Sequence, residues 1–169
     1  MNNKAAITRT ELEQRERKYG NSLVVSGIAV IFFGFWSVLK IIEEIAIGKV
    51  DFFEMLDLAD EEDIGIRVFM TVFFVLLTLA VIFLHYRVGR AAILVGRGKK
   101  KKFFYLLFAI SLLLLTVVSF PTYINPEAVD QDDVTIAAFF VDVAYCLALL
   151  DMVVSSFLIW RARKQLREG

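Results

Sequence analysis

The chain has 169 residues, of which 58% are hydrophobic and 16 are phenylalanines. Soluble domains average about 45–50% apolar residues, so this excess argues against an ordinary soluble domain and indicates a membrane protein. The 19 basic and 19 acidic residues cancel, which in so apolar a chain means that the charges are segregated between segments. The single cysteine, Cys146, excludes an intrachain disulfide and a multi-cysteine metal site.

The N-terminal segment, residues 1–21, is polar and shows no cleavable signal peptide. Thr10 followed three residues later by Glu13 is a capping box, with Thr10 as the N-cap. We therefore predict a short amphipathic cytoplasmic helix that ends before Gly20, and we expect the first apolar run to stay in the mature protein.

Four apolar runs follow, and a membrane span needs about 20 mostly apolar residues. They cover residues 22–42, 68–86, 103–120 and 136–160. Pro121 ends the third run, because proline cannot continue a helix. All four exceed the length of ordinary buried core helices. The predicted fold is therefore an all-α polytopic membrane protein, a single bundle of four transmembrane helices.

The charges between these runs predict the orientation. Residues 1–21, 87–102 and 161–169 hold sixteen of the 19 basic residues, whereas residues 43–67 and 121–135 are acidic. Because Lys and Arg in short loops mark the cytoplasmic side of a membrane, we predict that both termini and the 87–102 loop are cytoplasmic. We expect the protein to reside in the plasma (inner) membrane, with two acidic loops outside.

The first external loop carries two features. Phe52 and Phe53 alternate with Asp51 and Glu54, which predicts a short amphipathic helix on the outer leaflet. The acidic cluster Asp60 to Asp63 lacks the alternating acids and central glycine of a Ca²⁺ loop. We interpret the cluster as a solvated loop and predict no metal site.

The basic loop 87–102 is predicted to contact anionic lipid, because clustered Lys and Arg beside a span attract anionic headgroups. Its glycines, Gly89, Gly96 and Gly98, predict flexibility and speak against a fixed nucleic-acid groove. The basic residues expected to make the lipid contact are Arg87, Arg90, Arg97, Lys99, Lys100, Lys101 and Lys102.

Small residues mark where helices approach closely in a membrane. Gly20, Gly27 and Gly34 recur every seven residues and fall on nearly one face of the first span. Ala144 and Ala148 form a similar stripe in the fourth span. The glycine face has two interpretations: packing within one bundle, or an interface between identical copies.

Two acids lie inside the fourth span, and intramembrane acids indicate function unless they are protonated, paired or hydrated. Asp151 is predicted near the middle of the span, with Thr78, Ser111 or Ser155 as its hydroxyl partner, and we expect it to be neutral or to face water. Asp142 lies nearer the outer surface, where Lys40 is its simplest partner. Nine residues, or 900° of helix, place the two acids on opposite sides.

The only histidine, His85, closes the second span, where we predict an interfacial polar cap; a pH sensor is the alternative. The chain has no glycine-rich phosphate loop, HExxH, GxSxG or CxxC motif, so we expect neither an enzyme nor a cofactor.

Two function classes remain. The first is a small subunit, scaffold or sensor that acts by assembly with itself or with other membrane proteins. The second is an oligomeric cation channel or transporter with Asp151 on the pathway.

Overall fold

The computed structural model describes residues 2–46, 52–55, 63–99, 104–120 and 136–168. These residues form helices and short caps, in agreement with the predicted all-α class. The helices are α1 (Asn2–Ala46), α2 (Phe52–Met55), α3 (Ile64–Gly96), α4 (Tyr105–Ser119) and α5 (Ile136–Glu168).

Three helices are long and apolar enough to cross a membrane. The qualifying segments are Arg9–Ile42, Ile64–Gly96 and Phe139–Arg167. With 15 residues, α4 is about 22 Å long, less than the roughly 30 Å of a bilayer's hydrocarbon core. The chain is therefore compatible with a membrane-embedded protein, with three spans supported by helix length and α4 as a shorter apolar helix.

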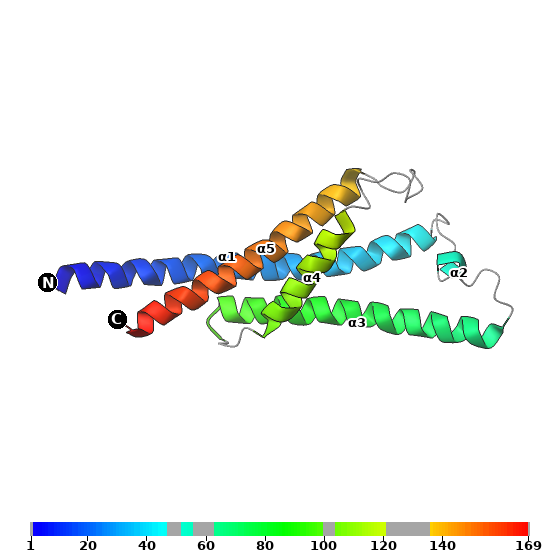
Figure 1. Cartoon of the computed structure of the whole chain (residues 1–169), viewed down its shortest axis with the longest axis horizontal. Helices are drawn as coiled ribbons and strands as arrows, with labels where there is room; N and C mark the ends of the chain where they lie inside the picture. Colours follow the sequence, from blue (N-terminus) through cyan, green and yellow to red (C-terminus); the bar gives the residue numbers. More distant parts are fainter. Residues whose placement is uncertain (1, 47–51, 56–62, 100–103, 121–135, 169) are drawn as a thin grey trace.

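α1 is the central helix of the arrangement. It packs most extensively against α3 and α5, and α4 packs against α5 and α3. Figure 1 shows α3 antiparallel to α1, with α5 crossing obliquely. The start of α1 and the ends of α3 and α5 lie at one end of the molecule (Figure 1). The buried core gathers around Leu23, Val30, Ala92, Leu149 and Met152.

Two predicted boundaries were wrong. The predicted separate N-terminal helix does not exist, because α1 runs without a break from Asn2 through Thr10 and Gly20 to Ala46. Thr10 is therefore not an N-cap. The predicted 87–102 loop is also wrong up to Gly96, since α3 continues through Arg87 and Arg90.

Glycines explain both corrections. Gly20 contacts Gly96 and Gly27 contacts Gly89, so that a Cβ added at Gly20 or Gly27 would lie 2.7 Å from the partner's carbonyl oxygen. Gly34 faces His85. We call these contacts the glycine seam. Gly89 and Gly96, which predicted flexibility, instead allow two long helices to approach closely. Among the described residues, Gly98, just beyond the end of α3, is the one glycine in the left-handed region, with φ +73°.

The seam also decides between the two interpretations of Gly20, Gly27 and Gly34. Their face of α1 is covered by α3 of the same chain, so it is not available as an interface between identical copies. In the structure these three glycines pack against another helix of the same bundle.

Several predicted features fall wholly or partly outside the described residues. The amphipathic helix of the first loop is described only as the single turn α2, which packs on α3 through the Phe52 and Phe74 rings. Asp63 is the N-cap of α3, accepting the Gly65 N–H at 2.7 Å. The segments that lie outside are residues 47–51, 56–62, 100–103 and 121–135.

Candidate functional site

Asp151 on α5 is held by three serine hydroxyls at the contact between α5 and α1. Ser22 Oγ lies 2.9 Å from Oδ1 and 2.7 Å from Oδ2 of the carboxylate. Ser26 donates to Oδ2, and Ser155 Oγ donates to Oδ1 at 3.2 Å. We call these four residues the Asp151 cluster.

Helical spacing builds the cluster. Ser22 and Ser26 lie four residues apart and share one side of α1, and Asp151 and Ser155 do the same on α5. Ser26 Oγ also lies 3.0 Å from the Ser22 carbonyl oxygen, the local bond that serine makes inside helices. Its single proton serves one of these two acceptors at a time.

The cluster is half enclosed. Ser26 and Ser155 are 3% and 2% exposed, whereas the Asp151 side chain opens to the outer surface of the helices. Among the described residues no Lys or Arg forms an ion pair with Asp151. The site is thus a carboxylate that hydroxyl donors fix on one side and that is exposed on the other. The exposed side can bind a cation or a hydrogen-bond donor from outside the chain.

The prediction for Asp151 was right about one hydroxyl neighbour, and its depth within the fourth span stays a prediction. Ser155 donates as expected, whereas Ser111 bonds to the Leu107 carbonyl at 3.0 Å. The α1 serines were not foreseen, although their spacing at the start of an apolar run was visible. Because α5 crosses α1 obliquely (Figure 1), Asp151 lies beside the first turns of that run and not beside its middle.

The other candidates in the spans are distributed differently. Asp142 and Lys40 are each half-buried, and their pairing stays a prediction. Ala144 is exposed and Ala148 is half-buried, so their packing role also stays a prediction. Arg87, Arg90, Arg97 and Lys99 are exposed. Lipid contact by these four remains a prediction, and Lys100, Lys101 and Lys102 lie outside the described residues.

His85 is not the interfacial cap that the sequence predicted, because it is 6% exposed between α1, α3 and α5. Its Nδ1 lies 2.8 Å from the Val81 carbonyl oxygen, which can only accept, so Nδ1 donates. Nε2 then accepts from the Tyr145 hydroxyl at 2.7 Å. Both ring nitrogens are satisfied inside the core, which makes the pair a packing element.

A clamp formed by Arg163 closes the end of the bundle where both termini lie. Arg163 Nε lies 2.6 Å from Glu16 Oε1 of α1, and Nη2 donates to the Val95 carbonyl oxygen of α3 at 3.1 Å. That carbonyl belongs to the last turn of α3, where backbone acceptors lack partners within the helix. One side chain thus joins three helices, which the sequence alone did not reveal.

Comparison with protein-family models, curated proteins and solved structures finds no match to this chain. Within the described part of the chain, no three His, Cys, Asp or Glu side chains come together as a metal site. The Asp151 cluster and the surface around it are therefore the candidate functional site.

Proposed function

We propose that this chain is a four-span integral membrane protein that acts by assembly, as a subunit, scaffold or sensor without enzymatic activity. The observation that carries the proposal is the Asp151 carboxylate, fixed by three serines and open at an apolar surface. A carboxylate in such a surface is costly in lipid unless it is paired or hydrated.

The surroundings of Asp151 support a protein partner. Val25 of α1 and Leu147 and Val154 of α5 are 67%, 60% and 52% exposed, and Val154 lies one turn from the acid. Apolar side chains around a small polar cluster are the pattern of a helix-packing surface in membranes, where polar contacts join helices that lipid alone does not drive together. Water at this position would have to sit among these side chains.

The orientation and the fourth span belong to the same proposal. α4 is the short fourth membrane crossing, and apolar residues flank it on both sides in the sequence. The basic end of the bundle is cytoplasmic. Figure 1 supports this arrangement, because the α1 start and the α3 and α5 ends share one end of the molecule. In the sequence, sixteen of the 19 basic residues belong to the segments 1–21, 87–102 and 161–169.

The test compares wild-type protein with Asp151→Asn in lipid bilayers. Asparagine keeps the size of the side chain and removes its charge. Single-molecule photobleaching counts the copies in each complex, and a liposome assay with Na⁺ or H⁺ gradients measures flux. We expect wild-type complexes, at least tenfold weaker assembly of Asp151→Asn, and no flux from either protein.

Asp142→Asn is the matched control, since it removes the other α5 acid on the opposite side of the helix. It should assemble as wild type does. Wild-type protein that stays monomeric and binds no other membrane protein contradicts the proposal. So does unchanged assembly of Asp151→Asn together with wild-type flux that the variant loses, which would place Asp151 on an ion pathway.

A further inference from the structure

Asp151 and Arg90 lie at nearly the same level of the bundle. The hydrogen bond between His85 of α3 and Tyr145 of α5 fixes a common level for the two helices, and both run toward the same end (Figure 1). Arg90 lies five residues beyond His85, and Asp151 lies six beyond Tyr145. At 1.5 Å per residue these are about 8 and 9 Å along the helices.

The glycine seam gives the same level independently. The α1 serines that hold Asp151 lie between Gly20 and Gly27, the first two glycines of the seam. Their contacts on α3 are Gly96 and Gly89, and Arg90 lies within that interval.

Arg90 faces outward from α3. Its Nη1 lies 3.2 Å from the Tyr86 hydroxyl oxygen, and its guanidinium lies 5.8 Å from the centre of the Tyr86 ring. Among the described residues neither Arg90 nor Arg87 forms an ion pair with a carboxylate. Two turns before Arg90 on the same helix, the exposed side chain of Phe83 is apolar.

The apolar runs of α1 and α3 are offset, which brings Arg90 toward the membrane. The apolar run in α1 begins at Ser22, between the levels of Gly96 and Gly89 on α3. The apolar run in α3 ends earlier, at Tyr86. Arg90 therefore lies beside apolar residues of α1 and not beyond them. An exposed charge at that depth needs an opposite charge, just as Asp151 does.

We infer that the partner covering Asp151 is a second copy of this chain, which contributes its Arg90 to the Asp151 cluster. The inference rests on the proposed assembly function. Two copies that cross a membrane in the same direction hold equivalent residues at equal depth. A rotation about the membrane normal therefore brings the acid of one copy to the guanidinium of the other, whose paired N–H groups match a carboxylate.

The contact joins two different faces of the molecule, the exposed side of the α1–α5 contact around Asp151 and the outer face of α3 around Arg90. Such a contact forms either a two-fold dimer in which the ion pair occurs twice or a closed ring with one pair per interface. In both cases the apolar side chains around the two charges pack against each other and exclude water.

The test is a complementation experiment with two differently tagged full-length chains. Asp151→Asn and Arg90→Gln are expressed separately and together in one membrane, and co-purification and photobleaching measure assembly. Each variant alone lacks the ion pair and should assemble at least tenfold more weakly than wild type. In the mixture, Asp151 of one variant meets Arg90 of the other, so complexes containing both tags should exceed either single-variant complex at least threefold.

Arg97→Gln is the matched control, because it removes an exposed base of the same segment seven residues nearer the end of the bundle. It should assemble as wild type does. Formation of the mixed complex also shows that both charge variants fold.

Three outcomes overturn the inference. If Arg90→Gln assembles as wild type while Asp151→Asn does not, the assembly function stands and the partner of Asp151 is another group. If Arg90→Gln keeps assembly but loses binding to vesicles of anionic lipid, Arg90 is a lipid contact. If wild-type protein is monomeric, the inference fails, and the proposed function fails with it only if the protein also binds no other membrane protein.

Discussion

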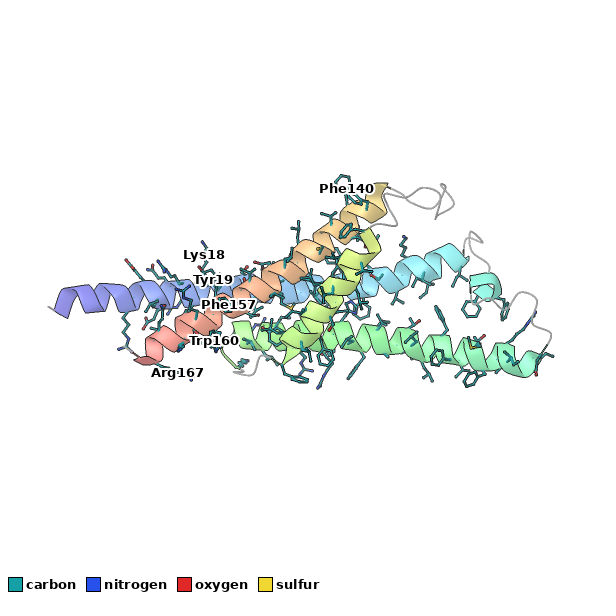
Figure 2. All side chains as sticks on the ribbon, viewed as in Figure 1. Lys18, Tyr19, Phe140, Phe157, Trp160 and Arg167 are labelled. Carbon is teal, nitrogen blue, oxygen red and sulfur yellow. The ribbon has the colours of Figure 1, made fainter. Side chains whose placement is uncertain are left out.

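The two halves of α3 differ more than their sequences suggest. The first half, Ile64 to Leu84, is almost continuously apolar, yet none of its residues is fully buried and most of its side chains project outward (Figure 2). The second half, His85 to Gly96, contains one histidine, two arginines and four small residues (two glycines and two alanines). It holds all the buried residues of the helix.

The difference teaches that hydropathy and packing are separate signals in a membrane protein. Of the three long helices, α3 has the most apolar segment, and only 6% of that segment is buried, whereas the apolar segments of α1 and α5 are each 33% buried. Lipid solvates an apolar side chain as well as protein does, so strong hydropathy marks the surface that faces lipid. Small residues and satisfied polar groups mark where helices meet.

The largest loss of free energy of unfolding should come from adding one methyl group to the second, packed half of α3. Gly89→Ala places a Cβ against the backbone carbonyl of Gly27, which cannot move without separating α1 from α3. Overpacking of this kind costs about 3 kcal/mol. Unfolding in mixed micelles, followed by tryptophan fluorescence, measures the loss of free energy of unfolding.

Gly65→Ala is the control in the uncovered half of the same helix. Its nearest neighbour is the Asp63 carboxylate, 3.1 Å from the added Cβ, and a shift of a few tenths of an ångström at the end of that side chain accommodates the methyl group. Alanine also raises helix propensity by about 1 kcal/mol, so this variant should be neutral or slightly stabilised. Equal losses from both substitutions would contradict the contrast between the two halves.

A smaller effect is expected at the Arg163 clamp. Arg163→Ala removes the cation from Glu16 and the donor from the Val95 carbonyl, and the cost should be about 1–3 kcal/mol in the same unfolding assay. The exposed neighbour Arg161 serves as the control, since Arg161→Ala should stay within about 0.5 kcal/mol of wild type. A loss for Arg161→Ala as large as that for Arg163→Ala would show that only net charge matters.

The sequence predicted the helical class, the apolar runs and the small residues of α1, because these depend on local composition and periodicity. It failed at Gly20 and at Arg87, where polar residues suggested an end to the helix and tertiary contacts between Gly20, Gly96 and their neighbours continue it. Helix propensity is a weak preference that such packing overrides.

The candidate site was predictable in its acid and not in its partners. Asp151 and Ser155 share one helix, so their spacing was visible in the sequence. Ser22 and Ser26 come from a helix more than 120 residues earlier, and their approach depends on the oblique crossing of α5 over α1. No pattern within a single span reports such an angle, and the buried position of His85 was missed for the same reason.

Spin-label accessibility in lipid bilayers tests the central claim, that another helix covers the Asp151 face, most directly. Val154 beside Asp151 and Leu76 in the first half of α3 are 52% and 59% exposed in the single chain, so they form a matched pair. In a Cys146→Ser background, each position is labelled in turn and its collision rate with dissolved oxygen is measured. The account predicts a rate at least threefold lower at position 154, with equality restored by Asp151→Asn. Equal rates at both positions in the otherwise wild-type chain would contradict it.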